Sequence, residues 1–411
     1  MPGKANVEKW RKRAFYFSIT VMLTGLFFSR ALLSSGMILF AAISLIHRNL
    51  LQQVKVFFSS PFLWSMGLLF VLPFISGLWS DNHSQWFQIL RIKVPLLLLP
   101  VCFAGETNFK FKDWKNISFI FLALVLGGIC TSLWQYFQNI HEVNKAYLKA
   151  YTIGTPLGND HVRFSLLVVI ALFTVIFLLA KNGQILAKPA RGLLSLFAVI
   201  TFIYLHVLAV RTGLVCFYLG VFVLLLWMLS RPKKKNLFLL LLVFFLPVAA
   251  YFIFPTFRNK VSYLKYDLSF VQKNIYMPGS SDGNRVASIR AGWELLKQQP
   301  LNGVGFGDIN DEAEKFYERD YSQMSANDKI LPSSEWLMYA AGVGWPGIIF
   351  FSFVMGMPFF VTSLRKNIFW ILLNIFIALS YLFDIGLEVQ YGVFIHAFVL
   401  LWWYKWLRLK E

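Results

Sequence analysis

Apolar segments of roughly 16 to 25 residues recur along the whole chain and limit the folds open to it. An α-helix rises about 1.5 Å per residue, so each segment crosses, or nearly crosses, the roughly 30 Å hydrocarbon core of a bilayer. The composition agrees, because 57% of the 411 residues are hydrophobic and only 14% are charged. A soluble domain of this length carries far more charge. The sequence therefore predicts an all-α integral membrane protein with about twelve transmembrane helices.

The expected spans form two groups that are separated by one long polar segment. The first group is 14–28, 31–46, 61–79, 89–104, 117–137, 163–180, 192–210, 213–230 and 237–254. The second group is 335–360, 367–383 and 386–404. We therefore expect residues 1–254 to hold spans one to nine, residues 255–334 to form one large loop domain, and residues 335–411 to hold spans ten to twelve.

Basic residues gather in alternate connecting segments. Examples are Arg11, Lys12 and Arg13 before the first span and residues 233–235 between the eighth and ninth. Because cytoplasmic loops of membrane proteins are enriched in Lys and Arg, both termini are placed in the cytoplasm and residues 255–334 outside. The net charge of +19 is thus a topology signal. It needs no nucleic-acid partner, which such a charge would suggest in a soluble protein.

Cations at the outer ends of the spans run against this charge rule. They are Arg30, Arg91, Lys93, Arg163 and Arg211, and the long loop adds Arg285 and Arg290. A charge within a membrane is costly and usually pairs or faces a wet cavity, and a guanidinium holds an anion through two parallel hydrogen bonds. The alternative for Arg211, Arg30 and Arg91 is that the side chain reaches the lipid headgroups. Together they predict a site for an anionic substrate presented from the bilayer, such as a lipid-linked diphosphate.

Two groups near these cations are candidate bases. His161 precedes the sixth span and shares a helix face with Ser165. Glu335 opens the tenth span, where a helix N-terminus stabilises a carboxylate, and Ser333 or Ser334 is expected to cap that helix. The alternatives are a hydrogen-bonded interfacial histidine and a simple capping role.

The long loop contains an amphipathic segment and a glycine-rich turn. Residues 288–300 (SIRAGWELLKQQP) predict a helix that ends at Pro300, with Ile289, Trp293, Leu295 and Leu296 available for one face. Residues 303–308 (GVGFGD) contain the glycines of a dinucleotide loop, but no strand precedes them and no βαβ unit surrounds them. We expect a tight turn whose glycines allow close backbone packing.

Three of these places together resemble the O-antigen ligase and polymerase superfamily of bacterial polytopic membrane glycosyltransferases. Residues 211–213 (Arg-Thr-Gly) are similar to the Arg-x-Gly element at the outer end of a mid-chain helix. Arg285 precedes residues 300–307 (PLNGVGFG) at the spacing of the family's loop arginine and its Pro-Leu-x-Gly-Val-Gly-x-Gly turn. Residues 333–337 (SSEWL) and 344–347 (GWPG) are similar to the closing His-Asn-x-x-Leu and Gly-x-x-Gly elements. The resemblance covers essentially the whole chain.

The resemblance implies an enzyme that moves a glycan from a polyprenyl diphosphate carrier to a sugar hydroxyl on the periplasmic side of the bacterial inner (cytoplasmic) membrane. Arg211 and Arg285 would neutralise the diphosphate, and no metal or other cofactor is implied. Ser333 stands where the family has a histidine, and a serine is not a comparable base at neutral pH. Glu335 or His161 is expected to replace it, unless the activity is altered or lost. The further substrate-binding candidates are Arg290, Arg91, Lys93, Arg163 and Arg30.

The acceptor separates the activities that this scaffold supports. A ligase uses the lipid A core, a polymerase uses a growing glycan, and related transferases use protein, so the resemblance alone does not choose among them. A transporter of lipid-linked sugars and a non-catalytic relative are the alternatives from other classes. The large outer loop and the lack of an evident internal repeat speak against the transporter. The expected partners are the lipid-linked donor, the acceptor glycan and membrane lipids.

Overall fold

A computed structural model describes residues 4–46, 49–181, 187–230, 237–273 and 275–409. All regular structure in these residues is helical, which confirms the all-α fold class. Within them, five helical segments are long and apolar enough to cross a membrane, or up to six if one bent pair counts as a single span. Shorter apolar helices accompany them. The figure of about twelve spans stays a prediction, and the basic cluster at residues 233–235 lies outside the described residues.

The chain folds into two compact units. Unit 1 comprises Met1–Ile117, Asn274–Lys366 and Tyr381–Glu411, and unit 2 comprises Ser118–Lys273 and Asn367–Ser380. Residues 255–334, expected to form one loop domain, are therefore divided between the units. Their placement outside the membrane stays a prediction.

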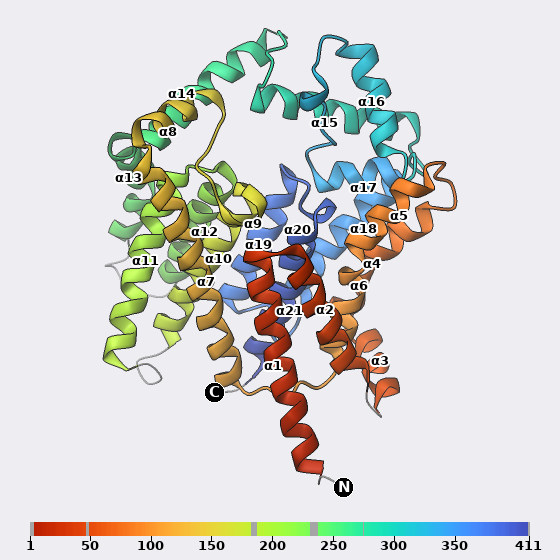
Figure 1. The fold of residues 1–411 in the computed structure, drawn as a ribbon, viewed down its shortest axis with the longest axis vertical. Helices are drawn as coiled ribbons and strands as arrows, with labels where there is room; N and C mark the ends of the chain where they lie inside the picture. Colours follow the sequence, from red (N-terminus) through yellow and green to blue (C-terminus); the bar gives the residue numbers. More distant parts are fainter. Residues whose placement is uncertain (1–3, 47–48, 182–186, 231–236, 274, 410–411) are drawn as a thin grey trace. The chain divides into compact units, whose positions relative to one another are not determined.

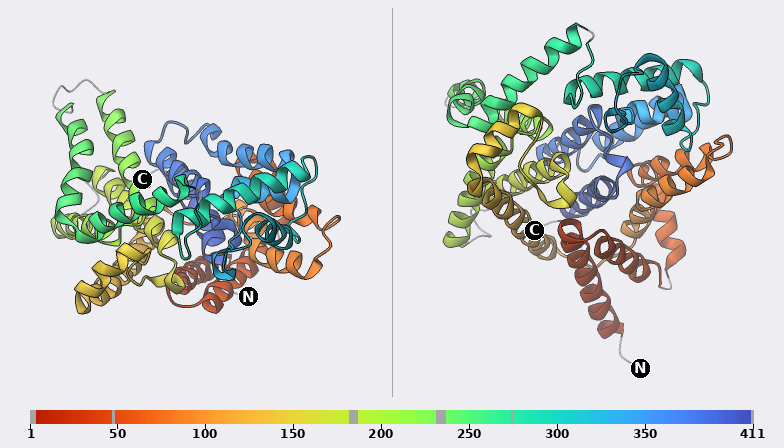
Figure 2. Two further views of the ribbon diagram at one scale, coloured as in Figure 1. Left: turned by 90° about the horizontal axis from the view of Figure 1, so that it is seen from above. Right: turned by 45° about the horizontal axis from the view of Figure 1, so that its top comes forward.

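Unit 1 contains the first helices of the chain, most of the long polar segment and the C-terminal helices (Figures 1 and 2). Its first helices are α1 (Lys4–Phe28), α2 (Arg30–Leu45), α3 (Leu50–Ser59), α4 (Pro61–Ser76), α5 (His83–Lys93) and α6 (Pro95–Ala104). Those of the polar segment and beyond are α15 (Ser281–Gln298), α16 (Ile309–Asp320), η3 (Ala326–Asp328), α17 (Glu335–Val343), α18 (Trp345–Gly356) and η4 (Met357–Phe360). The last are η5 (Gly386–Glu388), α20 (Gln390–Phe394), the π-helix η6 (Ile395–Val399) and α21 (Leu400–Arg408).

Unit 2 holds most of the long apolar helices. The first part of α7 belongs to unit 1 and the last residues of α19 return to it. The helices are α7 (Phe111–Gln138), α8 (Ile140–Ala146), η1 (Tyr147–Lys149), α9 (Pro156–Asn159), α10 (His161–Lys181), α11 (Lys188–Leu208), α12 (Arg211–Leu229), α13 (Leu237–Ile253), α14 (Pro255–Gln272) and α19 (Ile368–Leu382).

Two expected spans are not single regular helices. The span expected at 335–360 breaks at Gly344, whose φ of +73° and ψ of −158° end α17 and start α18. The span expected at 386–404 is a succession of 3₁₀, α and π turns that continues into α21. Hydropathy alone does not report such backbone breaks.

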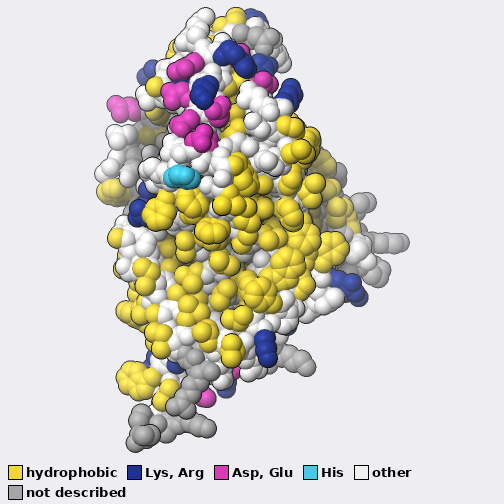
Figure 3. Space-filling view, turned by 90° about the vertical axis from the view of Figure 1, so that its right-hand side faces the viewer, with side chains coloured by type: hydrophobic (Ala, Val, Ile, Leu, Met, Phe, Trp, Pro, Cys, Tyr) yellow, Lys and Arg dark blue, Asp and Glu magenta, His cyan; other side chains and the backbone are white. Residues whose placement is uncertain are grey.

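Apolar side chains cover the middle of one face of unit 1 (Figure 3). Exposed large apolar residues lie on α4, α5 and α18, and include Phe74, Phe87 and Ile349, which are 53%, 59% and 63% exposed. Acidic and basic side chains gather at one end of this face, where α16 lies. An apolar surface of this kind fits contact with lipid, and the charged end fits contact with water.

Candidate functional site

Arg211 is the first residue of α12 and is half-buried. Two residues later, Gly213 faces α10, and a Cβ at that position would lie 2.7 Å from the Cβ of Ser165. Only a glycine permits this approach, because real Cβ atoms do not come so close. The glycine of the Arg-x-Gly element therefore brings α12 against α10 and determines where Arg211 lies.

Tyr147 holds the backbone turn that precedes Arg211. Its buried hydroxyl lies 3.0 Å from the carbonyl oxygen of Leu208 and 3.2 Å from that of Val207, and it accepts a hydrogen bond from the Ile153 N–H. Burial raises the pKa of Tyr147 well above its usual value, so the hydroxyl stays protonated. This side chain ties the end of α11 to the chain that leads into α10.

His161 and Arg163 lie in the first turn of α10. Asp160 accepts a hydrogen bond from the Arg163 N–H at 3.1 Å, and its carboxylate lies 3.2 Å from Nη1 of Arg163. His161 is half-buried at the start of the helix. Because α10 and α12 touch through Ser165 and Gly213, His161 and Arg211 lie at the same end of this helix pair.

Arg285 lies on α15, in unit 1, and is half-buried. No hydrogen bond or ion pair of its guanidinium is found within the described residues. The helix start is well defined, because the Ser280 hydroxyl accepts a hydrogen bond from the Gly283 N–H at 2.7 Å. An arginine presented in this way is suited to an anion.

Asp328 fixes the segment that leads into α15. Its carboxylate accepts hydrogen bonds from the Tyr276 hydroxyl, the Gly279 N–H, the Asn284 amide and the Ser325 hydroxyl. Burial raises the pKa of this carboxyl, but the hydrogen bonds outweigh burial, and the net pKa lies below its usual value. Asp328 is thus an anion that connects η3 to the beginning of the helix carrying Arg285.

Ser333, in the place of the family histidine, is joined to the same helix. Its buried hydroxyl forms a 2.8 Å hydrogen bond with the hydroxyl of Ser288, and its N–H donates to that oxygen at 3.2 Å. Ser288 in turn bonds the carbonyl oxygen of Arg285. The position that corresponds to the histidine therefore contacts Ser288, which lies about one helical turn after Arg285 on α15.

Glu335 begins α17 and is completely buried. Its Oε1 accepts a hydrogen bond from the Leu387 N–H, whereas Oε2 has no hydrogen-bond partner within the described residues. Ser334 occupies the N-cap position, but its hydroxyl donates to the Tyr381 carbonyl instead of capping the helix. The expected serine cap is therefore absent at this helix start.

Lys93 is also completely buried and is neutralised within the protein. Its ammonium lies 2.6 Å from Glu388 Oε1 and donates to the Leu387 carbonyl at 3.2 Å. It also lies over the rings of Phe306 and Tyr339. The role of Glu388 as partner of Lys93 is not visible in the sequence, because the two residues are separated by 295 positions.

The glycine turn at residues 303–308 packs as expected. The N–H of Val304 donates to Ala341 at 2.7 Å and that of Gly305 to Gly342 at 3.1 Å. A Cβ at Gly303, where φ is +66°, would lie 2.4 Å from the Ala341 carbonyl oxygen. The carboxylate of Asp308 accepts hydrogen bonds from the backbone N–H groups of Asp81 and Asn82. The turn is a structural connector between the end of α17 and the loop before α5.

The same turn meets the second glycine element. A Cβ at Gly344 would lie 2.4 Å from the Pro300 carbonyl oxygen, and the Trp345 N–H donates to that oxygen at 2.9 Å. The two family elements at residues 300–307 and 344–347 therefore form one packed assembly within unit 1.

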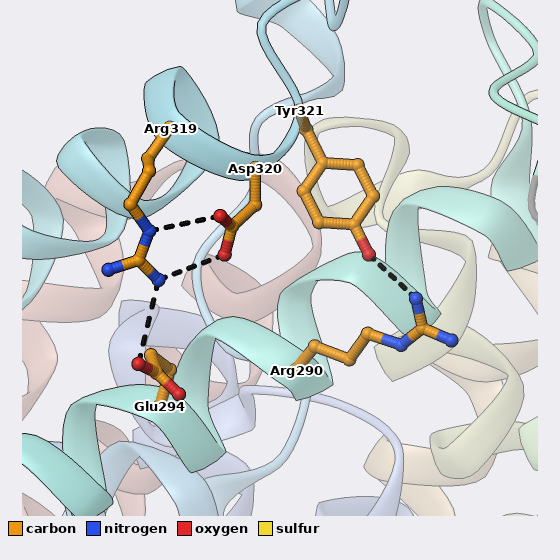
Figure 4. Close-up of polar contacts among 5 residues, drawn as sticks. All are labelled: Arg290, Glu294, Arg319, Asp320 and Tyr321. Carbon is orange, nitrogen blue, oxygen red and sulfur yellow. Dashed lines mark hydrogen bonds and ion pairs between the residues drawn. The ribbon is translucent and has the colours of Figure 1, made fainter.

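The remaining cationic candidates are exposed. Arg30 begins α2 and lies over the ring of Tyr391, and Arg91 lies in the last turn of α5. Arg290 donates to the Tyr321 hydroxyl at 3.0 Å (Figure 4). It is five residues after Arg285, so the two side chains leave α15 about 140° apart.

The apolar face expected for the helix at residues 288–300 is only partly buried. Trp293 is 44% exposed, while Leu295 and Leu296 are buried. The buried face also contains Ala287, Ser288 and Ala291.

The candidates thus fall into two groups. Unit 2 brings Arg211, His161 and Arg163 to one end of the α10–α12 pair, and unit 1 holds the others. The sequence alone does not mark the supporting residues Tyr147, Asp328 and Glu388. Each acts through a partner distant in the chain, and no local motif marks it.

Comparison with known protein families finds a match for one part of the chain. A family model described as O-antigen ligase matches residues 196–352. The matched segment contains Arg211, Arg285, Ser333, Glu335 and both glycine elements, and it begins after His161. No curated protein matches the chain. Residues 196–352 are thus similar to the O-antigen ligase family, and this match supports the resemblance of the chain to the O-antigen ligase and polymerase superfamily.

Proposed function

We propose that this protein transfers a glycan from a polyprenyl diphosphate carrier to a sugar hydroxyl on the periplasmic face of the bacterial inner membrane. The observation that carries the proposal is the O-antigen ligase match at residues 196–352. That segment includes both arginines that a diphosphate would require, Arg211 and Arg285. The exposed apolar surface in Figure 3 supports placement in a membrane, and the alternation of basic loops supports cytoplasmic termini.

In the proposed reaction, the acceptor oxygen attacks the anomeric carbon of the glycan. A new glycosidic bond forms as the bond from that carbon to the diphosphate oxygen breaks. Negative charge grows on the departing oxygen, and guanidinium groups aimed at it stabilise the transition state more than the ground state. Arg211 and Arg285 are assigned this role because both are half-buried, Arg211 at the first residue of α12 and Arg285 in the second turn of α15.

The acceptor hydroxyl must lose its proton to a base. Ser333 does not serve, because its hydroxyl is buried and bonded to Ser288. Glu335 is completely buried, and its carboxylate already accepts a hydrogen bond from the Leu387 N–H. A sugar hydroxyl can therefore reach Glu335 only if the surrounding protein opens. His161 is partly accessible and lies at the same helix-pair end as Arg211. We therefore assign the base role to His161 and treat Glu335 as the second candidate.

The test is a transfer assay with the purified protein in lipid nanodiscs. The donor is a polyprenyl-diphosphate glycan, and the acceptors are lipid A core, free glycan and peptide. Arg211→Ala and Arg285→Ala are each expected to reduce transfer by at least about 100-fold, the loss typical of removing one transition-state donor. Arg365→Ala is the matched control, because Arg365 is exposed in a segment expected on the cytoplasmic side.

The acceptor that is used decides between ligase, polymerase and protein glycosylation. Normal transfer in both arginine variants would remove them from the diphosphate site. A well-folded protein that transfers to none of these acceptors would contradict the enzyme assignment and favour a transporter or a non-catalytic relative. An arm with EDTA shows whether a divalent cation takes part.

A further inference from the structure

A groove in unit 1 lies between α15 and α16, on the side of α15 away from Arg285. The groove is open to the surface and has a volume of about 740 Å³. Its walls include Trp293 of α15. Figure 4 shows four further wall residues, Arg290 and Glu294 on α15 and Asp320 and Tyr321 at the end of α16. This volume lies within the range of roughly 300 to 1,000 Å³ that is typical of ligand sites in proteins.

The polar atoms of the groove are held in position by one another. Arg319 donates two hydrogen bonds of 2.9 Å to the carboxylate of Asp320, and its Nη2 lies 3.5 Å from Glu294. On the other side, Arg290 donates to the hydroxyl of Tyr321 at 3.0 Å. Figure 4 shows these contacts joining the two helices. A ligand therefore meets donors and acceptors whose side-chain freedom has already been reduced, which lowers the entropic cost of binding.

Aromatic rings accompany these polar groups. Trp293 is 44% exposed although it lies on a helix that is otherwise well packed. The ring centroids of Trp293 and Trp345 are 6.5 Å apart, and those of Phe316 and Tyr321 are 5.7 Å apart. An exposed indole with polar neighbours presents an apolar face to water, and burying that face under a ligand is favourable.

The balance of charges narrows the class of ligand. Arg290 and Lys297 contribute positive charge to the walls, Glu294 and Asp320 contribute negative charge, and Arg319 lies beside both carboxylates. A polyanion would meet repulsion from the two carboxylates, and a polycation would meet repulsion from the three basic groups. A lipid tail would have to desolvate them, and the groove helix α16 lies at the charged end of the face in Figure 3, beyond the apolar area.

We propose that this groove binds a glycan chain. The C–H face of a pyranose ring is apolar and stacks on an indole such as that of Trp293. Sugar hydroxyls donate to carboxylates such as Glu294 and accept from guanidinium groups such as Arg290. A ligand of this chemistry uses both charge signs and the aromatic face together. The proposal rests on the proposed function only for the source of the glycan.

The groove would hold sugar units remote from the bond that reacts. It is built from the same helix that presents Arg285, but from another face of that helix. Binding energy from remote units of a substrate can be used to orient its reacting end. The groove therefore provides a means to engage a long glycan without contact at the diphosphate.

The experiment measures binding directly, without catalysis. Isothermal titration calorimetry is carried out on the full chain in nanodiscs, with the water-soluble glycan that mild acid releases from the envelope of the bacterium encoding the protein. We expect saturable binding that Trp293→Ala and Glu294→Gln each weaken by at least about tenfold in Kd. The matched controls are Trp10→Ala, an indole 68% exposed near the N-terminus, and Glu318→Gln, an exposed carboxylate on α16. They are expected to leave Kd unchanged.

Absence of glycan binding by the unaltered protein would overturn the proposal. So would an unchanged Kd in both groove variants, which would leave contact with lipid headgroups as the role of Trp293. Failure of the proposed function looks different. In that case glycan still binds and Trp293→Ala still weakens it, although no transfer to any acceptor occurs.

Discussion

The ammonium of Lys93 lies 2.6 Å from Glu388, and the two side chains are only 0% and 6% exposed. Removing one member of a buried ion pair leaves the other charge without compensation. We expect Lys93→Met to lower the free energy of unfolding by about 3 to 5 kcal/mol. The measurement is the thermal unfolding midpoint of the purified protein in detergent.

The matched control for that change is Lys315→Met. Lys315 also lies 2.6 Å from a carboxylate, that of Glu312, but its side chain is 70% exposed. Exposed pairs contribute about 0 to 1 kcal/mol because water and salt screen them. Equal small shifts in the two variants would show that burial of Lys93 does not make its pair important.

Gly303→Ala is expected to destabilise unit 1. The new Cβ would lie 2.4 Å from the Ala341 carbonyl oxygen, and the backbone φ of +66° is unfavourable for alanine. The combined cost is expected to exceed about 2 kcal/mol. Yield and unfolding midpoint after purification measure it. Gly356→Ala is the control, because a Cβ there meets nothing within 4 Å. A normal midpoint for Gly303→Ala would contradict the close packing of the turn.

Arg285→Lys separates charge from geometry at the proposed diphosphate site. Lysine keeps the positive charge but cannot form two parallel hydrogen bonds with a phosphate. We expect kcat for transfer to fall by about 10- to 100-fold while the protein remains folded. Arg365→Lys should have no effect. Full activity in Arg285→Lys would show that only charge is needed at this position.

Ser333→Ala and His161→Gln test which side chain takes the acceptor proton. Loss of the Ser333–Ser288 hydrogen bond should cost about 1 kcal/mol of stability and leave kcat within about twofold. His161→Gln should lower kcat by about 10² to 10⁴, as expected for loss of a general base. If His161→Gln retains full activity, the same measurement on Glu335→Gln examines the second candidate.

Asp328 makes stability depend on pH in a defined direction. Its pKa in the folded protein lies below that in the unfolded chain, which is about 3.9. The carboxylate therefore stabilises the fold above that value, and the contribution is lost as the pH falls through the folded pKa. Asp328→Asn should lower the unfolding midpoint at pH 7 and have a smaller effect near pH 3.5. Glu318→Gln, an exposed change, should show no such difference. An equal effect of Asp328→Asn at both pH values would contradict this account.

Sequence determined the all-α fold class and the positions of several long apolar helices. Helices α7, α10 and α12 lie where the apolar runs predicted them. The reason is that a bilayer requires about 20 consecutive apolar residues to cross it as a helix, and such a run is visible in the local sequence. The close packing of residues 303–307 was also predictable, since a cluster of glycines is needed where backbones meet. The sequence elements that resemble the family also indicated Arg211 and Arg285 as candidates for binding the diphosphate, without knowledge of their tertiary contacts.

Only the tertiary structure decided which of the basic side chains are exposed and can contact a substrate. Lys93 and Arg91 are two residues apart and look equivalent in sequence, yet one is buried against Glu388 and the other is exposed. The difference comes from a partner 295 positions away, and hydropathy does not encode such pairings. The enclosure of Glu335 and the groove beside Trp293 likewise arise where distant helices meet, because burial and cavity shape depend on packing between elements.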